Sequence, residues 1–286
     1  LAAIAVVGTV SGGAQRWFEL GEFLLQPSEL IKVVLIVALA HYLSSREEKM
    51  ESLLTPIGAL LLIAPPVVLI YLQPNLSTAL SVVVIGGAML LMSGLRFRHM
   101  VLFGVAGAAA AVPAWKFLLQ DYMRERVLML VNPSGASPDD LYNVEQAIIG
   151  IGSGGWLGRG LFRGSQSQLH FLRVRHTDFI FSVTAEELGF IGAALLILLF
   201  GALLLRLVRI AGLARDTFGM LIVVGVTTMI FFQVVVNIGM NLRILPATGV
   251  PLPFVSYGGS SLWTMLIGIG LAESVILQHK KIGFDR

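Results

Sequence analysis

The stretch FIFSVTAEELGFIGAALLILLFGALLLR at residues 179–206 predicts a helix that crosses a membrane. A helix that crosses a membrane needs about 20 predominantly apolar residues, and this run is long enough to form one. The whole chain agrees with it, because 56% of the 286 residues are hydrophobic, only 13% are charged and the mean hydropathy is +0.84. These values predict an integral membrane protein and exclude a disordered chain, a fibrous repeat and a nucleic-acid-binding domain.

Six further apolar runs flank this stretch on both sides. We therefore predict seven full spans in an all-α, polytopic helical bundle that forms a single membrane domain over residues 1–286, with spans at about 28–43, 53–72, 76–93, 99–119, 179–206, 217–241 and 261–278. The apolar run Leu1–Val10 is too short to span and predicts the tail of a helix, hence a partial span. The chain has no cysteine, which excludes disulfides, thiolate metal sites and cysteine nucleophiles.

The short loops differ in charge on the two sides of the predicted membrane. One side carries ten basic residues in its loops and at the C-terminus, namely Arg46, Lys49, Arg96, Arg98, Arg206, Arg209, Arg215, Lys280, Lys281 and Arg286. The short loops of the other side hold only Arg16 and Arg243. Because cytoplasmic loops are enriched in Lys and Arg, we expect the first side, and the C-terminus, to be cytoplasmic.

The long loop at 120–178 falls on the outer side but is rich in arginine. Its basic residues are Arg124, Arg126, Arg159, Arg163, Arg173 and Arg175. We expect little regular secondary structure in it, and the glycines and apolar residues at 148–164 suggest a segment that dips into lipid. The arginines predict an anion site for a phosphorylated substrate. Contact with lipid headgroups is the alternative explanation.

Asp178 is the strongest single candidate for a catalytic residue, because its carboxylate lies between the arginine-rich loop and the next span. A carboxylate there can act as a general base on a sugar hydroxyl, whereas the alternative is that it only caps the helix. Asp178, Ser182 and Glu186 are spaced i, i+4 and i+8, so they form one polar stripe of about 12 Å on the helix. Acids within a span are functional or paired, and for Glu186 and Glu187 both explanations are open.

Other polar residues crowd the same predicted outer face. Glu29 and Lys32, spaced i, i+3 after Pro27, form either a substrate contact or a local ion pair. Asn237 and Asn241 share one face of their helix. The Pro- and Gly-rich loop that follows offers Ser256, Tyr257 and Ser260 as donors, and it forms either a wall of the site or a scaffold. His170 and His176 lack the spacing of a metal pair on a helix, so we predict no zinc site.

These motifs together resemble those of the SEDS family of shape, elongation, division and sporulation proteins, and its elongation branch more than its division branch. The resemblance covers essentially the whole chain, and it is carried by QSQL at 166–169, HTDFIF at 176–181, AEELG at 185–189, NIGM at 237–240 and LPFVSYGGS at 252–260. The stretches 13–17, 26–32 and 121–133 agree in the same order. The family fold has ten spans, so the resemblance implies that two spans and most of a third are absent here.

The resemblance implies a peptidoglycan glycosyltransferase that polymerises lipid II on the outer face of the bacterial inner membrane with a class B penicillin-binding protein. The essential aspartate of the family matches Asp178, whose implied role is to deprotonate the 4-hydroxyl of the acceptor sugar or to help hold a divalent cation such as Mg²⁺ or Mn²⁺. Undecaprenyl pyrophosphate would be the leaving group, stabilised by loop arginines. The residues expected to bind substrate are Arg124, Arg126, Glu29, Lys32, Gln166, Gln168, His176, Thr177, Glu186, Ser256, Tyr257 and Ser260.

The chain departs from the family pattern at two places. Asn75 and Ser77 stand in a QPNLST stretch where the family usually has Gln-Pro-Asp-Leu-Gly-Thr, so a carboxylate is missing. Arg173 and Val174 stand where Pro-Glu is usual, which makes the loop more basic. A lipid II flippase remains the alternative function because intramembrane acids also suit a transporter, and a scaffold that only anchors the transpeptidase is a third.

Overall fold

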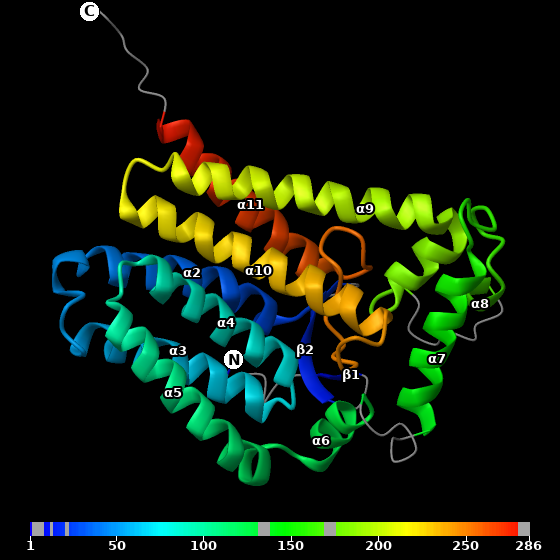
Figure 1. The fold of residues 1–286 in the computed structure, drawn as a ribbon, viewed down its shortest axis with the longest axis horizontal. Coiled ribbons are helices and arrows are strands. Elements are labelled where there is room, and N and C mark those ends of the chain that lie inside the picture. The colour runs from blue at the N-terminus through cyan, green and yellow to red at the C-terminus, as the bar shows by residue number, and fades with distance from the viewer. Residues whose placement is uncertain (2–8, 12–13, 21–22, 131–137, 169–175, 280–286) are drawn as a thin grey trace, which may run out of the picture. The chain divides into compact units, whose positions relative to one another are not determined.

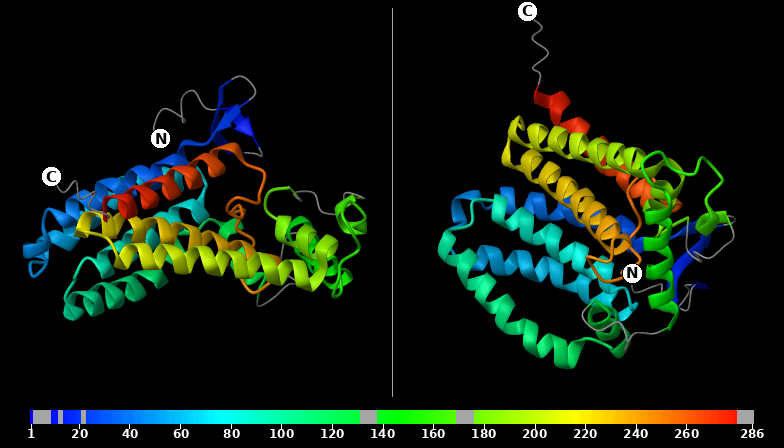
Figure 2. Two further views of the ribbon diagram at one scale, coloured as in Figure 1. Left: turned by 90° about the horizontal axis from the view of Figure 1, so that it is seen from above. Right: turned by 45° about the vertical axis from the view of Figure 1, so that its right-hand side comes forward.

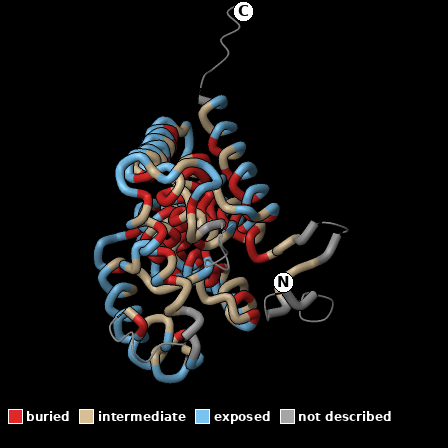
Figure 3. The backbone as a smooth tube through the Cα atoms, turned by 90° about the vertical axis from the view of Figure 1, so that its right-hand side faces the viewer, coloured by how far each residue is buried: buried red, intermediate tan, exposed pale blue. Residues whose placement is uncertain are grey.

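The computed structural model describes the chain except for residues 2–8, 12–13, 21–22, 131–137, 169–175 and 280–286 (Figure 1). The chain forms two compact units. The first contains residues 1–104, 203–232 and 259–286, and the second contains residues 105–202 and 233–258. The long helices other than α5 have buried and exposed sides, whereas only His99 is buried in α5, and the exposed sides are rich in apolar residues (Figure 3).

The first unit begins with a small antiparallel sheet. Its strands are β1 (Thr9–Ser11), β2 (Ala14–Leu20) and β3 (Phe23–Leu25), in the order β1-β2-β3. The strands lie next to the first turns of α2 and α11 (Figure 2). The prediction of a helical tail over Leu1–Val10 is therefore wrong at its end, where Thr9 and Val10 are in β1. Both are β-branched residues, which favour the extended chain.

The first unit contains most of the long helices. They are α2 (Pro27–Ser44), α3 (Leu54–Leu72), α4 (Leu76–Met92), the start of α5 (Phe97–Pro113), the end of α9 (Ile180–Gly212), the start of α10 (Thr217–Asn241) and α11 (Gly259–His279), with the short 3₁₀-helix η1 (Glu47–Lys49) before α3. Helices α2, α3 and α4 lie side by side, and α11 packs against α2 (Figure 1). At Gly225 of α10, a Cβ atom would lie 2.7 Å from the Ile36 side chain, so only glycine permits this close approach.

All seven predicted spans are helices, and their bounds agree with the prediction to within a few residues except at two ends. Among the described residues, six helices are long and apolar enough to cross a membrane, and α4, at 17 residues, is a shorter apolar helix. The run at 99–119 is α-helical only to Pro113 and continues as a π-helical turn, η2 (Ala114–Leu118). Proline cannot donate to the helical ladder, which accounts for the change there. The second exception is α9, which continues to Gly212 instead of ending near 206.

The second unit contains the long loop, and its described part is more regular than predicted. It holds α6 (Asp121–Leu128), α7 (Pro138–Ser153) and the single turn α8 (Ser165–Gln168), together with the first part of α9 and the last part of α10. Val144 and Ala147 of α7 are buried against Met129 and Phe179. This i, i+3 pair gives α7 an apolar stripe, and that packing explains why a segment expected to lack regular structure is helical.

Main-chain hydrogen bonds of the glycine-rich segment 155–160 join this loop to α9, and we call this contact the glycine clasp. The helix is kinked at Gly189, where φ is +69° and ψ is −168°. Across the kink, the amides of Arg159 and Gly160 donate to the Glu186 and Glu187 carbonyls, both at 3.0 Å, and the amide of Phe190 donates to the Gly155 carbonyl at 2.8 Å. The predicted lipid-dipping segment thus includes main chain bound to α9, while the Trp156 and Phe162 side chains are exposed. Its contact with lipid stays a prediction.

Replacement of Gly189 should break the clasp. A Cβ atom at Gly189 would lie 2.3 Å from the nitrogen of Gly158, and the positive φ is itself unfavourable for any other residue. We expect Gly189→Ala to lower the free energy of unfolding in detergent by about 2 kcal/mol or more. The control is Gly201→Ala in the same helix, where no atom lies within 4 Å of the new methyl group. Equal stabilities of the two variants would contradict this account of the kink.

Candidate active site

Asp178 lies in the turn that precedes α9, in the second unit. Its main-chain carbonyl accepts hydrogen bonds from the side-chain amides of Asn237 and Asn241, both at 3.0 Å. Its carboxylate faces Gly249, because a Cβ atom there would lie 3.4 Å from Asp178 Oδ2. Gly249 has φ +67°, so glycine both permits the turn and leaves room for the carboxylate. The carboxylate is thus set between the start of α9 and the loop that follows α10.

The two asparagines form a buried network with α9. Asn241 Oδ1 accepts from the amide and the hydroxyl of Ser182, at 3.2 and 2.5 Å. The Asn241 side-chain amide also donates to the Asn237 carbonyl at 2.8 Å, and the Asn237 amide donates to the Val250 carbonyl at 2.8 Å. Asn237, Asn241 and Ser182 are fully buried. The sequence placed the asparagines on one helix face, and the structure shows that this face holds the main chain at Asp178.

The environment of Asp178 favours the protonated carboxyl group. Burial raises the pKa of Asp178 above its ordinary value of 3.8, while the Thr177 side-chain hydrogen bond and the positive charge of Arg126 lower it. Burial is the largest of the three effects. A carboxylate with a raised pKa binds a proton more tightly than a solvent-exposed aspartate, which is the property that a general base needs.

The loop after α10 acts mainly as a scaffold for the turn at Asp178. The Ser256 hydroxyl donates to the Thr177 carbonyl at 2.6 Å and accepts from the Leu252 amide at 2.7 Å. The Tyr257 amide donates to the His176 carbonyl at 2.8 Å, and the Tyr257 side chain is exposed. The sequence leaves two roles open for this loop, a scaffold or a wall of the site. The hydrogen bonds of Ser256 favour the scaffold, and the exposed ring of Tyr257 is also compatible with a wall.

The two loop arginines that are expected to bind substrate, Arg124 and Arg126, have different surroundings. Arg124 donates to the carbonyls of Trp115 and Lys116, at 3.0 and 2.8 Å, and to Asp121 Oδ1 at 3.3 Å. Its guanidinium therefore fixes the turn between η2 and α6. Arg126 is half-buried and is the arginine whose charge acts on Asp178. The candidate anion-binding group beside the carboxylate is thus Arg126. Arg173 and Arg175 lie outside the described residues.

Glu186 is a structural acceptor within the second unit. It is fully buried, and its Oε1 accepts from the Gln166 amide at 2.9 Å and from the Ser165 hydroxyl at 3.4 Å. The predicted polar stripe is therefore divided, because Ser182 faces Asn241 while Glu186 holds the first turn of α8. Buried Gln166 Oε1 has no hydrogen-bond partner among the described residues. The side chain of Gln168 lies outside them.

The remaining candidates lie in the first unit. Lys32 Nζ donates to both carboxylate oxygens of Glu29 at 2.9 Å, and the Lys32 side chain is only 1% exposed. The pair is thus a buried local ion pair, and Lys32 does not extend outward. Ser260 Oγ accepts from the Gln26 amide at 2.8 Å, which joins the start of α2 to the start of α11.

Asn75, which stands where the family usually has aspartate, caps α4. Its Oδ1 accepts from the Thr78 amide at 3.3 Å. The preceding turn is held by Arg16, which donates to the Gln73 carbonyl at 2.8 Å and to the Pro74 carbonyl. Sequence reasoning missed this role of Arg16, because a contact between residues 57 positions apart leaves no local signal. The other departure, at Arg173 and Val174, lies outside the described residues.

The chain is similar to proteins of one family along nearly its full length. A family model described as "Cell cycle protein", for FtsW, RodA and SpoVE, matches residues 1–281. Peptidoglycan glycosyltransferase MrdB of Escherichia coli K12 is 43% identical over 285 residues, which are 99% of this chain and 76% of that protein.

Solved structures give the same family. One chain in a structure of a peptidoglycan synthase complex that coordinates polymerization and crosslinking is 37% identical, with a TM-score of 0.81 over 98% of this chain and 78% of that one. The crystal structure of rod shape determining protein RodA of Thermus thermophilus is 35% identical, with a TM-score of 0.68 over 98% of this chain and 75% of that one.

Removal of the Asn241 amide should loosen the turn at Asp178. In Asn241→Leu, the amide and hydroxyl of Ser182 lose their acceptor and the Asp178 carbonyl loses one donor. We expect the free energy of unfolding to fall by about 2 kcal/mol, because buried polar groups are left unpaired. The control is Thr184→Val, which removes one local hydrogen bond to the Ile180 carbonyl and should cost less than about 1 kcal/mol. Similar losses in both variants would contradict a special role for Asn241.

Proposed function

Because the chain belongs to the SEDS family and is a peptidoglycan glycosyltransferase, we propose that it joins lipid II units into glycan strands with Asp178 as the general base. The observation that carries the proposal is the position of this carboxylate, which is partly buried, has a raised pKa and is close enough to Arg126 to feel its charge. A base that feels the charge of a cation suits a reaction that removes a proton from one substrate and expels a pyrophosphate from the other.

The proposed step transfers one glycosyl group. The Asp178 carboxylate takes the proton of the acceptor 4-hydroxyl as that oxygen forms a bond to C1 of the donor sugar. The bond between C1 and the pyrophosphate oxygen breaks, and its electron pair leaves with undecaprenyl pyrophosphate. In this proposal Arg126, whose charge acts on Asp178, stabilises the negative charge that develops on the leaving group. Proton transfer by a positioned group contributes about 10²- to 10⁴-fold to such a rate.

The hydrogen bonds around Asp178 support this role because they fix its main chain from two sides. Asn237 and Asn241 bind its carbonyl, and Ser256 binds the carbonyl of the preceding Thr177. A rigid turn keeps the carboxylate at one place relative to both substrates, and misplacement of a reacting group is costly in rate. These residues act on the reaction through the position of Asp178.

The proposed membrane location follows from the charge of the loops, and the proposed partner follows from similarity to a chain in a solved complex. The excess of basic residues in one set of loops supports a multi-pass protein of the bacterial inner membrane with a cytoplasmic C-terminus and an active site that faces outward. The similar chain in a peptidoglycan synthase complex supports a class B penicillin-binding protein as partner. Such a partner would crosslink the strands that this chain polymerises during elongation and maintenance of cell shape.

Asp178 is the residue expected to ligate a divalent cation, and Mg²⁺ is usually held by one or two carboxylates together with water and substrate phosphates. Mg²⁺ and Mn²⁺ bind through several oxygen atoms, usually from carboxylates, carbonyls and water. Among the described residues, no group of three or more His, Cys, Asp or Glu side chains is arranged to hold a metal ion.

Replacement of the proposed base should abolish polymerisation. We expect Asp178→Asn to lower glycan synthesis from labelled lipid II by about 10²-fold or more when the protein is assayed with its cognate transpeptidase. The control is Glu145→Gln in the same unit, whose side chain is exposed and which should keep nearly full activity. Equal product from the wild type and Asp178→Asn would place the base elsewhere. Transport of lipid II by vesicles that contain either protein, without any polymer, would instead favour a flippase.

The pH dependence should report the charge of Arg126. Because burial raises the pKa of Asp178, the acid limb of kcat/KM should lie above pH 3.8 in the wild type. Arg126 favours the ionised carboxylate, so Arg126→Gln should raise the pKa of Asp178 further and move the acid limb to higher pH. Arg163→Gln, at an exposed arginine of the same unit, should leave the limb in place. An unshifted limb in Arg126→Gln would contradict the proposed pairing.

A further inference from the structure

The segment 155–163, which contains the glycine clasp, presents large apolar side chains on its surface. Four of them are 63–79% exposed, namely Trp156, Leu157, Leu161 and Phe162. The main chain of the segment is nevertheless hydrogen-bonded to α9 across the kink. The Trp156 ring also packs edge-on against the Phe190 ring of α9, with 5.1 Å between the ring centroids. An apolar surface held this firmly is typical of a site that contacts a partner or a membrane.

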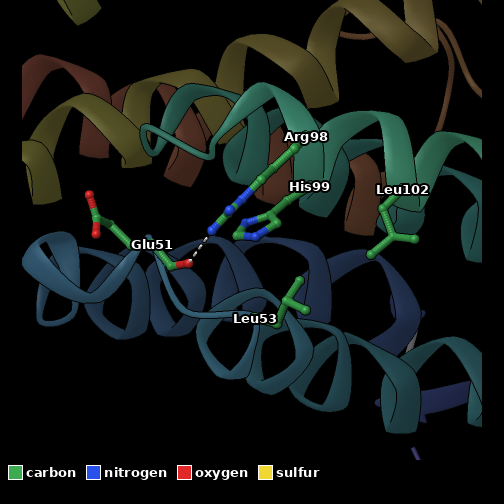
Figure 4. Close-up of a pocket in the computed structure, with 5 residues that line it drawn as sticks. All are labelled: Glu51, Leu53, Arg98, His99 and Leu102. Carbon is green, nitrogen blue, oxygen red and sulfur yellow. Dashed lines mark hydrogen bonds between the residues drawn. The ribbon is translucent and has the colours of Figure 1, made fainter.

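Charged side chains mark the predicted cytoplasmic ends of the spans. Arg98, in the first turn of α5, donates at 3.5 Å to the main-chain carbonyl of Glu51, which precedes α3 (Figure 4). Both helices are candidate membrane spans that begin beside these residues. At the corresponding end of α9 the charged residues are Arg206 and Arg209, which belong to the basic set of the same predicted side. The cytoplasmic end of the α9 span therefore lies close to these two arginines.

The length of α9 sets the depth of the glycine clasp in the membrane. No charged residue lies between Phe190 and Leu205, and α9 has the highest mean hydropathy of the candidate spans, at 2.7. Gly189 precedes Arg209 by 20 positions, which at 1.5 Å per residue span about 30 Å. The hydrocarbon core of a bilayer is also about 30 Å thick. With Arg209 at the cytoplasmic boundary of this core, the kink and the glycine clasp lie at its outer boundary.

The residue types of the segment suit the boundary between lipid and water. Tryptophan is enriched at the level of the headgroups, where its amphipathic ring is stable. Arg159 and Arg163 are exposed, and no described carboxylate lies within 4.0 Å of either side chain. Residues 146–177 contain no Asp or Glu that would repel lipid phosphates. A long arginine side chain lays its apolar stem along lipid and keeps its charged end at the phosphates.

We propose that the segment 155–163 anchors the active-site loop in the outer leaflet of the membrane. Its four exposed apolar side chains lie among the upper acyl chains, and Arg159 and Arg163 bind the phosphate groups of the lipids. The contact is with the bilayer and does not depend on the proposed glycosyl transfer. A partner protein would also cover the apolar side chains, but it would give no reason for the glycine clasp to lie one bilayer thickness from Arg209.

The depth of the segment can be measured with single cysteines, because the chain has none of its own. Leu157→Cys and Leu161→Cys are each labelled with an environment-sensitive dye in vesicles of phosphatidylethanolamine and phosphatidylglycerol. The quenchers are lipids with a nitroxide near the headgroup, lipids with a nitroxide near the end of the acyl chain, and aqueous iodide. We expect the nitroxide near the headgroup to remove the most fluorescence at both positions, and iodide to remove the least.

Two control positions calibrate the depth. Leu198→Cys, which is 68% exposed in the middle of α9, should lose most fluorescence to the nitroxide near the end of the acyl chain. Glu145→Cys, at an exposed position of α7 in the same unit as the segment, should be quenched mainly by iodide. Thermal unfolding of each labelled variant identifies one that has lost its fold, and the second position then still tests the proposal.

Three results would overturn the anchor. Iodide quenching at positions 157 and 161 as strong as at 145 would place the segment in water. Iodide quenching that disappears only when the transpeptidase is bound would assign the surface to the partner protein. The pattern of position 198 at both positions would place the segment in the centre of the bilayer, away from the lipid phosphates.

Discussion

The site depends on the hydrogen bonds that Asn237 and Asn241 donate to the main-chain carbonyl of Asp178. Both asparagines are fully buried, and a carbonyl in such surroundings needs a donor. Asparagine suits this position because its side chain donates and accepts at once, so Asn241 also receives the amide and hydroxyl of Ser182. The start of α9 and the end of α10 are thereby tied at the residue that we propose as the base.

The same burial that demands these hydrogen bonds sets the chemistry of the carboxylate. Burial raises the pKa of Asp178, so its carboxylate binds a proton more tightly than an exposed aspartate does. Arg126 and the hydroxyl of Thr177 act in the opposite direction and lower this pKa. The positive charge of Arg126, which favours the carboxylate, also suits a pyrophosphate leaving group.

Apolar periodicity predicted the spans well, because a run of about 20 apolar residues has few alternatives to a membrane helix. It failed where distant residues decide the structure. Thr9 and Val10 pair with β2 instead of continuing a helix, and α7 folds because Val144 and Ala147 meet Phe179. Asp178 was recognised from its motif, but the spacing of Glu186 left its role open. Only the fold shows that this acid receives the amide of Gln166.

Asn75 shows how a departure from a family pattern can be neutral for structure and still matter for chemistry. As the residue before α4, it accepts the Thr78 amide through Oδ1, and asparagine caps a helix about as well as aspartate. The start of α4 therefore does not need the acid that the family usually has there. What the chain lacks is a negative charge beside the turn held by Arg16. Replacement of Asn75 by aspartate would restore that charge and leave the helix cap in place.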